Sequence, residues 1–158
     1  MNATLFTLTF AVAAPFWALM ILLPSWRVTA RIVRSPLIVM PAATIYAILV
    51  LPALGEVLPT VASPTLDAVR DLLGTDDGAA AAWAHMIAFD LFVGRWAWLD
   101  SRERRMPALV MAPVLVLTIL LGPLGLAVYL AVRTRWGRPP AARSADPQRL
   151  VRQPPFVR

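Results

Sequence analysis

Three ionisable residues lie inside one apolar segment of this chain, and their types indicate acid–base chemistry. His85, Asp90 and Arg95 fall within the stretch WAHMIAFDLFVGR, and His85 is the only histidine in 158 residues. Asp90 is close to the midpoint of the apolar run 79–99. An ionised carboxylate at the centre of a membrane costs about 2.5–3.5 kcal/mol even on lenient insertion scales. Since desolvation disfavours the charged form, we expect Asp90 to be a neutral acid that can donate a proton.

Each of the three residues also has a structural interpretation. Arg95 lies near one end of the run and could extend its side chain to the lipid headgroups. His85 could be a hydrogen-bonded core residue that joins two helices. On a helix, five residues turn about 140°, so the three do not share one stripe, and each must find partners on a different neighbouring helix. The structural interpretation is weakest for Asp90, which needs a partner or a proton at that depth.

Aromatic residues and a helix break accompany these ionisable residues. Two sets of residues are candidates for contact with a substrate: Trp83, Phe89 and Phe92 near His85, and Gly122 and Pro123 in LLGPLGLAVY. The aromatic side chains fit a groove for a long apolar ligand, but they also fit ordinary packing at membrane interfaces. The Gly-Pro pair predicts a helix break, which either lines a cavity or only kinks the helix.

Composition indicates an integral membrane protein. The chain is 59% hydrophobic, with a mean hydropathy of +0.67. Four apolar segments reach the roughly 20 residues that a spanning helix requires, at about 3–23, 36–55, 79–99 and 107–132. Because an open sheet cannot satisfy its backbone in lipid, we expect an all-α bundle of four transmembrane helices, kinked by prolines. The expected location is the cell (inner) membrane, as a multi-pass protein.

The charges of the connections predict an orientation but leave one conflict. Residues 26–35 carry three arginines and no acid, 56–78 carry five acids and one arginine, and 100–106 carry three arginines and two acids. The positive-inside rule therefore places the first and third connections in the cytoplasm. With four spans, the tail 134–158 would lie outside despite its six arginines. Either the tail is exported, or the fourth segment is re-entrant; the continuity of 107–132 favours four full spans.

The remaining composition excludes several classes of site. The chain has no cysteine, and with one histidine we expect no metal site and no cofactor. The net charge of +6 lies mostly after the last apolar segment, so nucleic acid is not an expected partner. We expect a membrane domain over 1–133 and a disordered, Arg/Pro-rich tail over 134–158. That tail either contacts anionic lipid headgroups or is only solvated. The oligomeric state is open.

The third apolar segment also carries a motif. It has the form W-x-H-x-x-A-x-D-L-F-x-x-R-x-x-x-x-D and continues as DSRER, with GPLGLAVY and PFWALMILLPSW elsewhere in the chain. These motifs resemble the abscisic-acid-deficient-four family, small membrane proteins linked in plants to neoxanthin synthesis, and in particular its bacterial members. The resemblance covers roughly residues 6–133. The motif residues are Trp83, His85, Ala88, Asp90, Leu91, Phe92, Arg95 and Asp100.

The resemblance implies a neoxanthin synthase-like isomerase or accessory factor of carotenoid biosynthesis. Neoxanthin forms when the epoxide oxygen of violaxanthin is protonated, the ring opens and a proton leaves the polyene side. For that chemistry we expect Asp90 as the acid, His85 as the base or proton relay, and Arg95 as an electrostatic or structural anchor. Another carotenoid or isoprenoid end-group fits equally well as the apolar ligand. The alternatives are a non-catalytic scaffold of a carotenoid-modifying complex and a small proton-coupled transporter.

Overall fold

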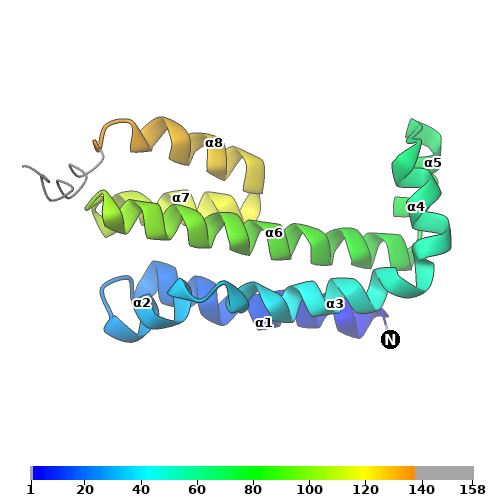
Figure 1. Ribbon diagram of the computed structural model, residues 1–158, viewed down its shortest axis with the longest axis horizontal. Helices are drawn as coiled ribbons and strands as arrows, with labels where there is room; N and C mark the ends of the chain where they lie inside the picture. Colours follow the sequence, from blue (N-terminus) through cyan, green and yellow to red (C-terminus); the bar gives the residue numbers. More distant parts are fainter. Residues whose placement is uncertain (1, 138–158) are drawn as a thin grey trace, which may run out of the picture.

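The computed structural model describes residues 2–137, and every regular element in that range is helical (Figure 1). The expectation of an all-α fold is therefore confirmed. Most of the predicted tail, residues 138–158, lies outside the described residues. In chain order the elements are α1 (Asn2–Leu22), α2 (Arg27–Arg34), η1 (Pro36–Val39), α3 (Met40–Val50), η2 (Leu51–Ala53), α4 (Leu54–Ala62), α5 (Leu66–Leu73), α6 (Asp76–Glu103), α7 (Ala108–Leu120) and α8 (Gly122–Arg133).

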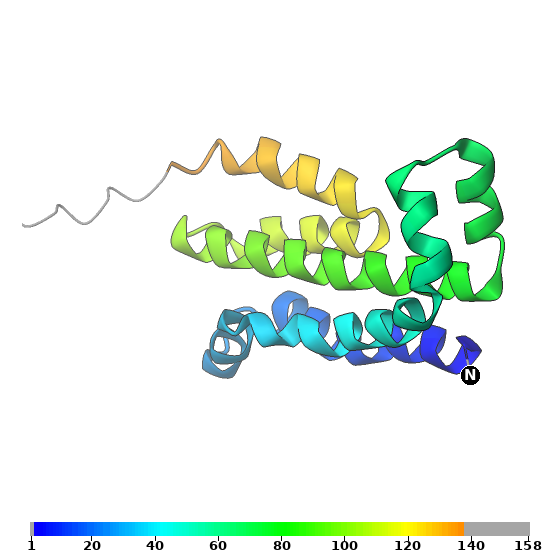
Figure 2. The same cartoon turned by 45° about the vertical axis from the view of Figure 1, so that its right-hand side comes forward.

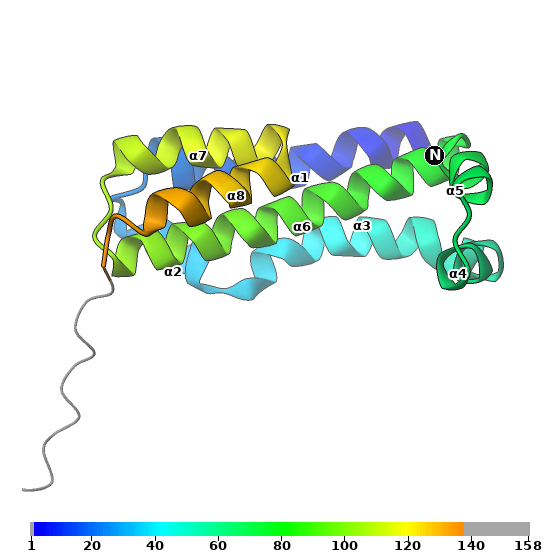
Figure 3. The ribbon, with the colours of Figure 1, turned by 90° about the horizontal axis from the view of Figure 1, so that it is seen from above.

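Helix α6 is the central element of the bundle. Its 28 residues give a length of roughly 42 Å, and it packs against α1 and α3 on one side and α7 and α8 on the other (Figures 1 and 3). Helices α4 and α5 lie across one end of the bundle and α2 lies at the opposite end (Figure 2). Every candidate residue of the third apolar segment thus sits on the helix that contacts most of the others.

Two helical stretches are long and apolar enough to cross a bilayer. They are Asn2–Leu22, with 21 residues, and Pro36–Ala62, with 27 residues. Only 22% of the most apolar window of each is buried inside the protein, so most of this apolar surface faces outward. Helices of this kind indicate association with a membrane. The second stretch alternates between 3-10 and α geometry because Pro36, Pro41 and Pro52 lack the amide hydrogen that a regular helix needs.

The apolar segment 107–132 differs from the single helix expected there. Helix α7 ends at Leu120, the chain reverses at Leu121, and α8 runs back antiparallel beside α7 (Figure 3). Pro123 cannot continue a preceding helix but suits the first turn of a new one. Gly125 allows the two helices to touch, since a Cβ atom there would lie 2.4 Å from the Cα of Thr118. We call residues 108–133 the α7–α8 hairpin.

The hairpin reaches only part of the way along α6. Its two helices have 13 and 12 residues, which corresponds to roughly 20 and 18 Å, whereas the hydrocarbon core of a bilayer is about 30 Å thick. The tip of the hairpin lies near the middle of α6, and its far end returns to the end of the bundle where α2 lies (Figure 1). Neither helix is long enough to cross a bilayer by itself.

Candidate functional site

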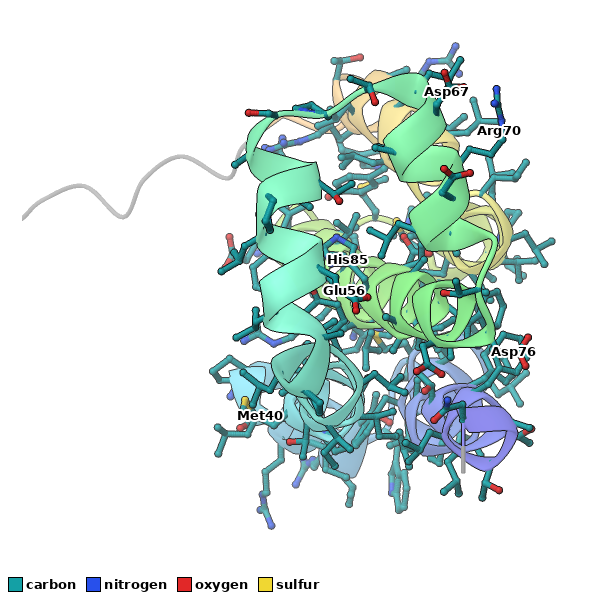
Figure 4. All side chains as sticks on the ribbon, turned by 90° about the vertical axis from the view of Figure 1, so that its right-hand side faces the viewer. Met40, Glu56, Asp67, Arg70, Asp76 and His85 are labelled. Carbon is teal, nitrogen blue, oxygen red and sulfur yellow. The ribbon has the colours of Figure 1, made fainter. Side chains whose placement is uncertain are left out.

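His85, Asp90 and Arg95 lie on three different sides of α6. His85 faces α3, Asp90 faces the tip of the α7–α8 hairpin, and Arg95 faces α2. In the end-on view of Figure 4, His85 points to the side of α6 that is away from α1. The structure therefore does not bring the three ionisable side chains together into one cluster.

His85 lies in an apolar groove between α3 and α6. The groove has a volume of about 350 Å³. The His85 ring stacks on Phe89 at a centroid distance of 4.6 Å and meets the edge of Tyr46 at 5.4 Å. The residues that line the groove are Val39, Ala43, Tyr46, His85, Ala88, Phe89 and Phe92. Since the other linings are hydrocarbon and aromatic rings, His85 and Tyr46 supply the polar groups of this groove.

A second hollow extends this groove toward α4 and α5. Its volume is about 370 Å³, and it shares Tyr46 and His85 with the first. Its other linings are apolar residues of α3 to α6, including Val57 of α4, Leu72 of α5 and Met86 of α6. We call the two hollows together the α3–α6 groove. From Gly78 to Phe92 the groove follows α6 for roughly 21 Å, so its shape suits a long apolar molecule.

Asp90 contacts the tip of the hairpin. The carboxylate packs so closely on Gly122 that a Cβ atom there would lie 1.9 Å from Oδ1 and 2.7 Å from Cγ of Asp90. Gly122 begins α8, and the start of a helix is the positive end of the helix dipole. The position of Asp90 therefore suits a carboxyl group that gives up a proton and then holds a negative charge.

Arg95 is occupied by the backbone at the end of α2. Its Nε donates to the carbonyl oxygens of Val33 at 2.8 Å and Ser35 at 3.2 Å, and its Nη2 donates to that of Arg34 at 2.6 Å. These carbonyls close the C-terminus of α2, where a positive charge is favourable. The contacts favour the role of a structural anchor for Arg95 over a role in proton transfer.

The candidate substrate-binding residues divide among three places. Phe89 and Phe92 line the groove. Gly122 is buried and Pro123 is exposed at the tip of the hairpin. Trp83 lies instead on the α1 side, where it stacks with Phe6 at a centroid distance of 5.2 Å. Sequence reasoning did not single out Val39 and Ala43 as groove residues, because small apolar side chains in an apolar helix carry no signal.

Asp100 forms a polar network that fixes the returning leg of the hairpin to α6. Its Oδ2 accepts hydrogen bonds from the Tyr129 hydroxyl at 2.5 Å and from Arg104 Nε at 2.7 Å, and its Oδ1 accepts one from Arg133 at 3.2 Å. Burial acts to raise the pKa of Asp100, but the hydrogen bonds from Tyr129 and Arg104 and the nearby charge of Arg133 hold the pKa below its ordinary value. A carboxyl group with a lowered pKa adds stability above its unfolded pKa of about 3.9. That contribution is lost as the pH falls through the lower pKa of the folded state.

Tyr129→Phe tests this network. The Tyr129 side chain is fully buried, and the change removes its hydrogen bond to the Asp100 carboxylate. We expect a loss of about 1.5–3 kcal/mol in the free energy of unfolding, because the acceptor is charged. Thermal unfolding in detergent measures the effect. Tyr46→Phe is the control, with an expected change within about 0.5 kcal/mol; equal losses in both variants would contradict the network.

Apolar helices surround a central helix whose apolar part, residues 79–99, carries three ionisable side chains. This arrangement defines a class of small helical membrane-associated proteins. The chain belongs to the ABA4-like family, because the family model described as ABA DEFICIENT 4-like matches residues 4–129. This confirms the resemblance seen in the sequence motifs, and the family is related to neoxanthin synthase-type proteins. No curated protein and no solved structure matches the chain.

Proposed function

We propose that this protein binds a carotenoid-like lipid in the α3–α6 groove and isomerises its oxygenated end-group with Asp90 as the acid. The observation that carries the proposal is the position of Asp90 relative to the groove. Met86 lines the groove and precedes Asp90 by one helical turn on the same face of α6. Asp90 itself lines neither hollow, so a polyene that lies along the groove would extend its end-group past Met86 to reach the carboxyl group.

The chemistry that fits this arrangement is the opening of an epoxide. The Asp90 carboxyl group donates its proton to the epoxide oxygen as the carbon–oxygen bond breaks. A proton then leaves the carbon chain on the polyene side, so that the product is an isomer of the substrate. The negative charge left on Asp90 is favoured by the start of α8, and the same carboxylate can take up the second proton.

His85 has a different role in this proposal. It lies about 140° around α6 from Asp90, and its ring stacks with Phe89 inside the groove. His85 therefore contacts the polyene of the ligand and serves as a proton relay at most, rather than as the base at the end-group. Violaxanthin is one candidate substrate, and other epoxidised carotenoids or isoprenoids have the same reacting group.

The assay for this function uses membranes that contain the protein and a supplied epoxidised carotenoid. The expected product has the same mass as the substrate and a different retention time and absorption spectrum. An unchanged substrate in membranes with folded, abundant protein would overturn the proposed reaction.

A second candidate is a non-catalytic scaffold in a carotenoid-modifying complex. It is favoured by two contacts that hold helices together, Asp90 against the hairpin tip and Arg95 against the end of α2. The scaffold and the isomerase differ in the effect of Asp90→Asn on turnover, which only the isomerase would lose in a folded protein.

We propose that the protein lies in the cell membrane as a multi-pass protein. The chain crosses the bilayer three times, and its α7–α8 hairpin enters and leaves the bilayer on the same side. The crossings would be α1, residues 36–53 (η1, α3 and η2) and the apolar residues 79–99 of α6. The hairpin then returns the chain to the α2 end, so the arginine-rich segments 27–34, 102–105 and 133–135 lie at one end. The acids of 56–77 lie at the other end. This arrangement puts every arginine cluster, including the start of the tail, on the cytoplasmic side.

Single cysteines test this topology, because the natural chain contains none. We expect Asp71→Cys to react with a membrane-impermeant maleimide in intact cells. Ser25→Cys and Thr134→Cys should react only after the cells are opened. All three positions are exposed. With four full crossings, Thr134→Cys would instead be labelled from the same side as Asp71→Cys, and that result would contradict the re-entrant hairpin.

A further inference from the structure

Helix α2 presents three arginines on one outward face. Arg27, Arg31 and Arg34 are exposed and follow the spacing i, i+4, i+7, which places them along one side of a helix. Thr29 and Val33 on the opposite side are fully buried against the bundle. The helix is therefore fixed to the protein by one face and displays a row of positive charges on the other.

These three charges have no acidic partner within the described part of the chain. The salt bridges there involve Arg70, Arg104 and Arg133, and none involves an arginine of α2. Arg95 holds the end of α2 through the carbonyl oxygens of residues 33–35. That contact fixes the orientation of α2 and adds a further positive group beside it.

Exposed apolar side chains border the arginines. Trp26 is 50% exposed and precedes the first turn of α2, and Leu22 at the end of α1 is 72% exposed. Leu23 and Leu37 are also exposed. Tryptophan favours the interface between hydrocarbon and headgroups, and a basic helix beside an apolar rim is typical of a segment that lies in this interface.

We propose that α2 and its apolar border form a binding surface for anionic phospholipids in the leaflet at this end of the bundle. The guanidinium groups of Arg27, Arg31 and Arg34 bind the phosphate oxygens, and Trp26 and Leu22 contact the upper part of the acyl chains. Guanidinium and phosphate match in charge and in hydrogen-bond geometry. This surface is distinct from the α3–α6 groove and does not depend on the reaction at Asp90.

The experiment measures which lipid the full-length protein retains. The protein is reconstituted in vesicles of equal parts phosphatidylglycerol and phosphatidylcholine and extracted in mild detergent, and its retained lipids are quantified by mass spectrometry. We expect a preference for phosphatidylglycerol that falls about tenfold or more in the triple variant Arg27→Gln, Arg31→Gln, Arg34→Gln, because this variant removes the direct charge-assisted hydrogen bonds to the phosphate.

The matched control removes three positive charges from other segments at the same end of the bundle. The triple variant Arg102→Gln, Arg105→Gln, Arg135→Gln changes three exposed arginines outside α2 and should keep most of the preference. Equal losses in both triple variants, or no preference in the natural protein, would overturn the proposal.

A second measurement needs no change to the arginines. Brominated phosphatidylglycerol should quench the fluorescence of Trp26, obtained as the difference between the natural protein and Trp26→Phe, more strongly than brominated phosphatidylcholine. Equal quenching by the two lipids would overturn the proposal even if the triple variant of α2 failed to fold.

Discussion

Asp90→Asn is expected to lower turnover of the epoxide end-group by about 10²- to 10⁴-fold, the range that a positioned general acid contributes. The amide has nearly the same shape as the carboxyl group, so it can keep the contact with Gly122. It cannot donate the proton that opens the epoxide. Chromatography of products formed per amount of folded protein measures the effect.

Glu103→Gln is the matched control for this change. Glu103 is an exposed acid at the C-terminal end of α6, so its neutralisation should leave turnover unchanged. Full turnover in a folded Asp90→Asn protein would show that Asp90 is not the acid. Loss of the fold in this variant would instead assign Asp90 to the scaffold interpretation.

Gly122→Ala is expected to reduce turnover at least tenfold while Asp90 itself is unchanged. The added methyl group would occupy the place of the carboxylate, since a Cβ atom there lies 1.9 Å from Oδ1 of Asp90. The carboxyl group must then turn away or the hairpin tip must move, at a cost of about 1–3 kcal/mol in the free energy of unfolding. Turnover and thermal unfolding of the same preparation measure the two effects.

A control variant and a double variant separate the effect of Gly122→Ala on packing from its effect on turnover. Gly55→Ala meets no atom within 4 Å and should change neither quantity substantially. In an Asp90→Ala background, Gly122→Ala should cost less stability than it does alone, because the two groups compete for one space. Additive costs would show that the two residues are not in contact.

The sequence predicted the helical class, the family and the helix that carries the ionisable residues. It also predicted that His85, Asp90 and Arg95 point in different directions, because each step of five residues turns about 140° around a helix. Their partners could not be predicted, because contacts with Tyr46, Gly122 and the carbonyls of α2 join residues 32 to 62 positions apart.

The reversal at Leu121 shows a different limit. Gly122 and Pro123 predict a break, but a break can be a kink or a complete reversal. The reversal is fixed by tertiary contacts, namely the approach of Gly125 to Thr118 and the hydrogen bond from Tyr129 to Asp100. The groove was also hidden in the sequence, because Val39 and Ala43 on the wall opposite α6 are ordinary apolar residues.

The most direct test of the account is to identify what occupies the α3–α6 groove. The natural protein and two variants are purified in mild detergent from cells that make epoxidised carotenoids. In Ala43→Trp the added side chain fills the groove. Ala18→Trp is the control, because Ala18 lies on the exposed side of α1. We predict that the natural protein and Ala18→Trp retain a carotenoid, that Asp90→Asn retains the epoxide form, and that Ala43→Trp retains little. Equal pigment in the two tryptophan variants, or none in the natural protein, would contradict a ligand site in the α3–α6 groove.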